Sequence, residues 1–163
     1  MRTMKGLAVA ALALAGVAAL AACTHEQGVL GLNPGYRLGY DDKGSSAALA
    51  YGMPNSDDLA LMLECPKGTG RIELSDSTHG KAATALVLTA GGRRTSVPVQ
   101  ISATDDGSND PQVLVGHLTS RADALQAFRR TGVLEVSNGS SRYVVTVLAD
   151  RKAGVERFFR ECG

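Results

Sequence analysis

Hydrophobic residues alternate with polar residues along most of this chain, at a spacing of two. The clearest run places Leu59, Leu61 and Leu63 on one side of a strand and continues with Cys65 on the same side. Side chains of a strand point alternately to its two faces, so these residues should face one core. Short runs of this kind, separated by clusters of Gly, Asp and Ser, are typical of antiparallel β structure. The pattern predicts strands over residues 47–53, 59–65, 71–75, 83–89, 94–101, 113–118, 133–137 and 141–148.

Two segments follow the helical period instead. The first helix is predicted to begin at Ser120, whose hydroxyl can cap the first turn, and to end before Gly132. A second helix is predicted over residues 150–162, because an apolar stripe recurs there at helical spacing. The stripe consists of Val155, Phe158, Phe159 and Cys162. Together the elements predict an α+β fold that is mainly β, an antiparallel sandwich or partly open barrel of about eight strands with one inserted helix and one C-terminal helix.

Proline and glycine residues constrain the strands further. Pro98 cannot donate a backbone hydrogen bond, so its strand is predicted to lie at an edge or to carry a bulge. The dipeptide Asn138-Gly139 separates two predicted strands and indicates a hairpin with a type I′ turn centred on those two residues. Asn33-Pro34-Gly35 is turn-forming and is predicted to mark the start of the folded domain.

The N-terminal segment has the pattern of a secretory signal. Arg2 and Lys5 precede an uncharged run over residues 6–22 that ends in small residues and Cys23. The alternative is a permanent transmembrane helix, since the run approaches the ~18 to 20 residues that span hydrocarbon. Its alanine-rich composition and the absence of a cationic stop signal behind it favour a cleaved leader.

The sequence Leu20-Ala21-Ala22-Cys23 resembles the lipobox of bacterial lipoproteins. The resemblance implies cleavage before Cys23 after its sulfur has received a diacylglyceryl group, and palmitate or similar acyl chains as the membrane anchor. It divides the chain into a signal peptide (1–22), a lipidated tether (23–34) and a single periplasmic β-rich domain (35–163). Thr24 is not Asp, which by resemblance to enteric sorting rules implies the periplasmic face of the outer membrane.

Charge and length limit the classes of partner. Loss of residues 1–22 removes two of the 17 basic residues, so the formal charge changes from +1 to −1 against 16 acidic residues. No basic cluster remains, and nucleic acid is therefore not an expected partner. The remaining length suits a single domain.

Cysteine usage fits an oxidising compartment. Of the three cysteines, Cys23 is assigned to lipid, which leaves Cys65 and Cys162 as an even pair. Both continue predicted inward faces, one on a strand and one on a helix. The sequence therefore predicts a disulfide between Cys65 and Cys162, and the absence of a Cys-x-x-Cys motif gives no support to a redox centre or a four-cysteine zinc site.

Residues 59–162 also resemble small periplasmic proteins associated with type VI secretion and related envelope domains of unknown function. The resemblance rests on the following segments: Leu63-Glu64-Cys65, Leu134-Glu135-Val136, residues 143–147 and a terminal helix that closes on Cys162. The chain departs from that pattern because it lacks a tryptophan and has Asp150-Arg151-Lys152 where a Gly-led helix start is usual. The resemblance implies an analogy of fold alone. Another envelope protein is the partner expected for the binding function compared below.

No recognisable catalytic motif follows the leader. The histidines His25, His79 and His117 are isolated, and neighbouring carboxylates such as Asp57-Asp58 point to opposite faces of a strand. The stretch 105–110 lacks the spacing of an EF-hand loop, so we predict no metal, no cofactor and no catalytic residue. Four tyrosines, Tyr36, Tyr40, Tyr51 and Tyr143, are scattered along the sequence, which argues against an aromatic sugar-binding platform.

Two functions are therefore compared. The first is a non-catalytic envelope lipoprotein that binds a partner or supports an assembly through an exposed strand edge or a loop patch. The alternative is a small periplasmic hydrolase or ligand carrier with a pocket between the sheet and a helix. A pocket that holds His79 or His117 near two carboxylates would favour the alternative, whereas a filled core with one bare edge or apolar patch would favour the first.

Overall fold

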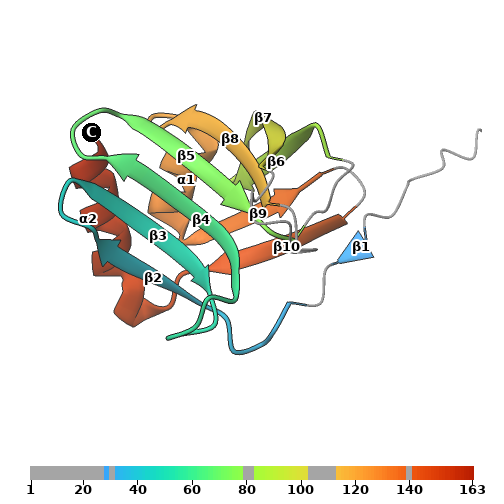
Figure 1. Ribbon diagram of the computed structural model, residues 1–163, viewed down its shortest axis with the longest axis horizontal. Coiled ribbons are helices and arrows are strands. Elements are labelled where there is room, and N and C mark those ends of the chain that lie inside the picture. Colours follow the sequence, from blue (N-terminus) through green and yellow to red (C-terminus); the bar gives the residue numbers. More distant parts are fainter. Residues whose placement is uncertain (1–27, 30–31, 79–82, 103–112, 139–140) are drawn as a thin grey trace, which may run out of the picture.

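Within the residues that the structure describes, nine antiparallel strands curve into a nearly closed, barrel-like sheet with two helices (Figure 1). The computed structural model describes residues 28–29, 32–78, 83–102, 113–138 and 141–163. The strands are β2 (Arg37–Asp42), β3 (Ser46–Gly52), β4 (Leu59–Pro66), β5 (Arg71–Asp76), β6 (Ala85–Ala90), β7 (Arg93–Ser102), β8 (Val113–Thr119), β9 (Val133–Ser137) and β10 (Ser141–Thr146). Their order across the sheet is β10-β9-β6-β7-β8-β5-β4-β3-β2. The predicted mainly β fold is confirmed, in its form as a partly open barrel.

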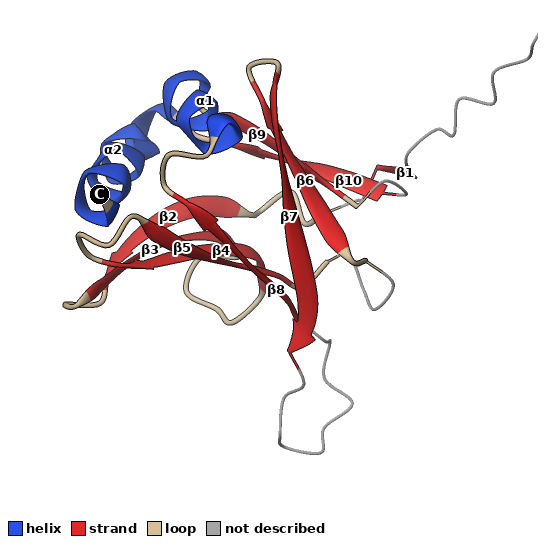
Figure 2. Ribbon diagram, turned by 90° about the horizontal axis from the view of Figure 1, so that it is seen from above, coloured by secondary structure: helices blue, strands red, loops and turns tan. Residues whose placement is uncertain are grey.

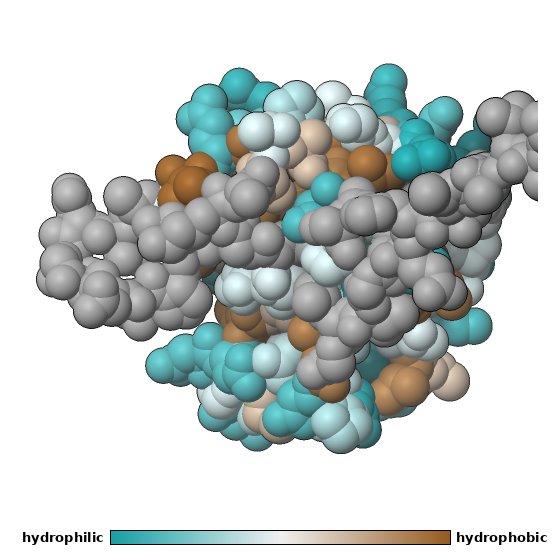
Figure 3. All heavy atoms as spheres, turned by 90° about the vertical axis from the view of Figure 1, so that its right-hand side faces the viewer, coloured by the Kyte–Doolittle hydropathy of each residue, from teal (hydrophilic) through white to brown (hydrophobic). Residues whose placement is uncertain are grey.

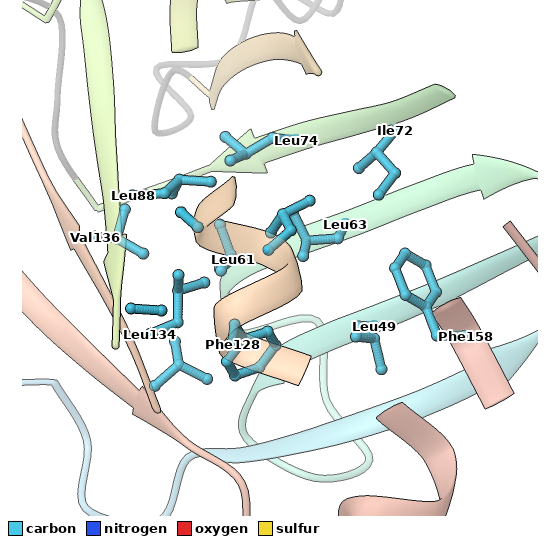
Figure 4. Close-up of a cluster of buried hydrophobic side chains, with 14 of the residues drawn as sticks. Leu49, Leu61, Leu63, Ile72, Leu74, Leu88, Phe128, Leu134, Val136 and Phe158 are labelled. Atoms are coloured by element: carbon cyan, nitrogen blue, oxygen red, sulfur yellow. The ribbon is translucent and has the colours of Figure 1, made fainter. Parts of the chain in front are cut away.

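The strand faces that alternation assigned to the core do line it. In β4, Leu61, Leu63 and Cys65 are each at most 2% exposed. Leu59, predicted to share their face, is half-buried, because the register with β3 shifts between Leu61 and Leu59. Figure 4 shows side chains from several strands and from both helices converging on this core. They include Leu49, Leu61, Leu63, Ile72, Leu74, Leu88, Phe128, Leu134, Val136 and Phe158. Each buried side chain of this size contributes about 1.5 to 3 kcal/mol to folding.

Two strands were not expected. β2 begins the barrel, yet its sequence has one fully buried hydrophobic residue, Leu38, and ends in two acids. A two-residue strand, β1 (Gly28–Val29), lies in the segment predicted to be a tether and pairs in parallel with Ser141 and Arg142 at the start of β10. Both strands depend on neighbours distant in sequence, which local alternation does not reveal.

The predicted edge position of the strand containing Pro98 is wrong, because β7 lies between β6 and β8. The physical constraint nevertheless holds locally. β7 pairs with β6 over Arg93–Pro98 and with β8 only from Val99 onward. The backbone nitrogen of Pro98 points toward β8, just beyond the last residue of β7 that pairs with β8. The missing N–H therefore removes no hydrogen bond from that ladder.

The first helix, α1 (Asp123–Thr131), is capped differently from the prediction. Its N-cap residue is Ala122 and makes no side-chain capping bond. Thr95 of β7 supplies the missing acceptor, because the N–H of Ala124 donates to Thr95 Oγ1 at 3.2 Å. Ser120 is instead buried, and its carbonyl accepts a bond from Gln126. Gly132 ends the helix in the left-handed conformation, as predicted.

The predicted hairpin between β9 and β10 is present, with a shifted turn. Asn138 N–H donates to the carbonyl of Ser141, so these two residues form the closing pair. Asn138 therefore closes the ladder and does not occupy a central position of the turn. The predicted conformation of Gly139 lies outside the described residues.

The second helix, α2 (Lys152–Cys162), follows a short 3₁₀ turn, η1 (Ala149–Arg151), and packs on β2 and β3. It buries the predicted stripe of Val155, Phe158, Phe159 and Cys162. Figure 2 shows α1 and α2 gathered at one end of the barrel, which we call the helix end. β1 lies at the opposite end in both views, which we call the β1 end (Figures 1 and 2).

Gly154 allows α2 to approach β2 closely. A Cβ atom at this position would lie 2.8 Å from Cβ of Tyr40. The helix propensity lost at Gly154, about 1 kcal/mol relative to Ala, is therefore the cost of close packing.

Charged side chains reinforce the same contact. Glu161 of α2 accepts hydrogen bonds from Arg157 and from the hydroxyl of Tyr40, each at 2.7 Å. Lys67 lies 3.1 Å from the same carboxylate. These partners, the Arg157 bond first among them, lower the pKa of Glu161 to about 2.

The last turn of α2 is fixed to the turn between β4 and β5. The N–H groups of Gly68 and Gly70 donate to the carbonyls of Glu161 and Cys162, at 2.7 and 2.6 Å. A disulfide joins Cys162 to Cys65 of β4, with 5.7 Å between the two Cα atoms. The carbonyls that a helix C-terminus leaves without partners are thus satisfied, and the helix end is cross-linked to a central strand.

Loss of the disulfide should destabilise the whole domain. The bond spans a sequence separation of 97 residues, and the chain-entropy estimate for a loop of that size is about 4.7 kcal/mol as an upper figure. We expect Cys162→Ser to lower the melting temperature substantially. Reductant should have the same effect on the wild type and no further effect on the variant. Two free thiols in the denatured, unreduced protein would contradict the assignment.

Candidate functional site

Of the histidines and acidic stretches singled out from the sequence, few lie in the part of the chain that the structure describes. Cys23, His25, His79 and the stretch 105–110 lie outside the described residues. His117 is exposed on β8, across from Glu73 of β5. The two side chains line an outer cleft of about 690 Å³, in which Glu73 is the one carboxylate among the described lining residues. The described lining of this cleft therefore provides one of the two carboxylates that an acid/base site with His117 would need.

Three of the four tyrosines come together, although the sequence separates them. The rings of Tyr36 and Tyr51 meet edge to face, with 5.7 Å between their centroids. Tyr51 and Tyr143 lie parallel, with 6.4 Å between their centroids. Tyr40 is separate, since its ring contacts Arg157 of α2. The sequence-based conclusion that the tyrosines are dispersed therefore does not describe the folded chain.

Each end of this row of rings is held by a carboxylate. Tyr143 is 2% exposed and donates its hydroxyl to Asp76 at 2.6 Å, and Asp76 is 1% exposed. The other oxygen of Asp76 accepts bonds from the N–H and the hydroxyl of Thr78, at 2.8 and 3.0 Å. At the opposite end Tyr36 donates its hydroxyl to Asp58.

The three phenols stay neutral over the physiological range. Burial and the adjacent Asp76 raise the pKa of Tyr143 well above its ordinary value. The hydrogen bond to Asp58 raises the pKa of Tyr36 to about 12. Burial also raises the pKa of Tyr51, and the positive charge of Arg37 opposes that rise. None of these groups is activated as a base or nucleophile, so the cluster is suited to binding.

The tyrosines form part of a groove beside the open seam of the barrel. The groove has a volume of about 420 Å³, within the usual range of ligand sites. It lies between the segment that leads into β2 and the outer edge of β10, and we call it the seam groove. It is lined by Leu32, Asn33, Pro34, Tyr36, Arg37, Tyr51, Tyr143, Val144, Thr146 and Leu148.

Apolar side chains reach the surface around this groove. Val144 and Leu148 are 46% and 44% exposed. The space-filling view of the β1 side of the molecule shows apolar residues at the surface between polar ones (Figure 3). The seam groove therefore combines aromatic rings, exposed aliphatic side chains and one cation.

Arg37 is the charged side chain among the described residues that line the seam groove. Its Nη1 donates to the carbonyls of Pro34 and Tyr36, at 2.8 and 2.7 Å. Within the described part of the chain no carboxylate pairs with it. The guanidinium is thus positioned by backbone acceptors and keeps donors for a bound group.

Comparisons with known proteins give no family: no family model, curated protein or solved structure matches the chain. Neither helix of the described residues is long and apolar enough to cross a membrane. The described residues also hold no group of three or more His, Cys, Asp or Glu side chains that could bind a metal ion.

Sequence reasoning missed the seam groove because its walls come from three distant segments. Tyr36 precedes β2, Tyr51 lies in β3 and Tyr143 lies in β10. A local signal exists only for Tyr143, whose place in the alternation of β10 puts it on the inner face. The meeting of the rings depends on the strand order.

The bond between Tyr143 and Asp76 should contribute measurably to stability. Tyr143→Phe leaves a buried carboxylate oxygen without this donor, and we expect the free energy of unfolding to fall by about 1 to 3 kcal/mol. Tyr51→Phe is the matched control, because the Tyr51 hydroxyl makes no hydrogen bond within the described residues. Urea titration of both variants checks this. Equal stability of the two variants would show that Asp76 does not depend on Tyr143.

Proposed function

We propose that this chain is a membrane-anchored periplasmic lipoprotein that acts as a non-catalytic binding module of the cell envelope. The observation that carries the proposal is the seam groove, which lies beside a stretch of β10 that has no strand partner on its outer side among the described residues. The lipobox at Leu20–Cys23 supports the proposed location on a membrane. Thr24 favours the periplasmic face of the outer membrane, and another envelope protein is the partner that this location favours.

The short tether orients the proposed module. Four residues, Thr24 to Gln27, lie between lipidated Cys23 and Gly28, the first residue of β1. At ~3.3 to 3.6 Å per residue, the five steps from Cys23 to Gly28 span at most about 18 Å. The β1 end of the barrel is therefore held close to the membrane, and the helix end points into the periplasm. The seam groove runs along the edge of β10 that pairs with β1 at its start.

A hydrolase or ligand carrier is the alternative function. It would need a pocket in which a histidine meets two carboxylates, and the described lining of the cleft beside His117 provides Glu73 alone. The tyrosine hydroxyls are held neutral by their surroundings. These features favour binding over catalysis.

One complementation experiment tests both the lipid anchor and the non-catalytic assignment. Metabolic labelling with a palmitate analogue should mark the wild type, and Cys23→Ala should abolish both the label and complementation of the gene deletion. The double variant His79→Ala/His117→Ala is the matched control and should complement fully. An unlabelled wild type would refute the anchor. Loss of function in the double histidine variant, with an unchanged melting temperature, would refute the non-catalytic assignment.

A further inference from the structure

The outer edge of β10 presents backbone groups that have no strand partner among the described residues. In an antiparallel ladder, alternate residues direct both N–H and C=O to the same neighbour. Val147 donates to the carbonyl of Gly132, and the carbonyl of Ser141 accepts from Asn138, so odd-numbered residues of β10 face β9. Val144 and Thr146 therefore direct their backbone groups outward, toward the seam.

The same edge already accepts a strand at its start. β1 pairs with Ser141 and Arg142, and within the described residues this ladder does not continue along β10. β2, the other edge of the sheet, is in contact with η1, α2 and β10. The stretch of the β10 edge that borders the seam groove contains Val144 and Thr146.

The side chains beside this edge fit an extended guest. Successive outward backbone groups on one strand recur every two residues, about 6.6 Å apart. Tyr36, Tyr51 and Pro34 line the groove alongside them with ring faces and edges. A free sugar would meet the rings without using the outward N–H and C=O groups, whereas a peptide strand uses both.

The charge of the groove selects among peptides. Arg37 is fixed by two carbonyl acceptors and has no carboxylate partner in the described part of the chain. A guest carboxylate can accept its remaining donors. An acidic side chain or a C-terminal carboxylate on the guest would therefore match this position.

We propose that the seam groove binds an extended peptide segment of a partner protein, which continues the edge of β10 beside β1 as an added strand. Apolar side chains of the guest lie against the tyrosines, and an acidic group meets Arg37. This mode of recognition takes affinity from backbone bonds and specificity from side-chain contacts. The inference rests on the proposed binding function and names the chemistry of its partner.

Selection of peptides on the lipidated, full-length mature chain in detergent tests the proposal. A phage-displayed library of random linear peptides is panned on the wild type, and the enriched peptides are measured by fluorescence anisotropy. We expect enriched sequences to carry an acidic residue among apolar ones, and Arg37→Gln to weaken their binding. Failure to enrich any peptide would overturn the inference.

A proline variant of β10 distinguishes binding through backbone hydrogen bonds from binding through side-chain contacts alone. Thr146→Pro removes one outward N–H, and proline is tolerated on an edge strand where that N–H faces solvent. We expect affinity to fall about tenfold, the effect of one lost hydrogen bond. The matched control Thr146→Val keeps the N–H and the side-chain shape, and should bind within about twofold of the wild type.

Equal binding by Thr146→Pro and Thr146→Val would overturn strand addition. If Thr146→Pro does not melt like the wild type, Val144→Pro removes the next outward N–H and is compared with Val144→Thr in the same way. Fatty-acid labelling of Cys23 together with no selected peptide would refute this inference and leave the lipoprotein assignment standing.

Discussion

The cross-link between α2 and β4 is the constraint on which the helix end of the barrel depends. Cys65 extends the inward face of Leu61 and Leu63, and Cys162 extends the buried stripe of α2. The disulfide joins these two patterns at the last turn of α2, where the N–H groups of two glycines in the neighbouring turn donate to the final carbonyls of the helix. A terminal helix that contains Gly154 is thereby held in close contact with β2. With α2 in place, the edge of β2 is covered and the core beneath it is sealed.

The seam stays open on the other side for a reason of topology. Nine strands in antiparallel succession bring the two end strands, β2 and β10, into the same direction. Closure would therefore require a parallel pair, which is slightly less stable per residue than an antiparallel one. Uncovered edges are sites at which further strands can add. In this fold the stretch of β10 that has no strand partner on its outer side among the described residues lies beside the row of three tyrosines.

The sequence predicted those parts of the fold that depend on local periodicity. The inward face of β4, the buried stripe of α2 and the left-handed Gly132 were all recognisable from spacing. Features that depend on distant partners were not recognisable from the sequence. Thr95 caps α1 in place of Ser120, and β2 forms from an acidic, glycine-containing segment. Pro98 lies inside the sheet because the ladder between β7 and β8 ends beside it. The tyrosine cluster belongs to the second group. Tyr36, Tyr51 and Tyr143 meet only because the strand order brings the start of β2, the end of β3 and β10 to one seam.

Hydrogen exchange of individual amides in the unliganded, lipidated protein tests most directly whether the edge of β10 is open. The account predicts alternating protection along the strand, with slow exchange at Tyr143 and Val145, which bond to β9, and fast exchange at Val144 and Thr146, which face the seam. Equally slow exchange at all four amides would mean that the edge is already paired, and would contradict a binding function for the seam groove.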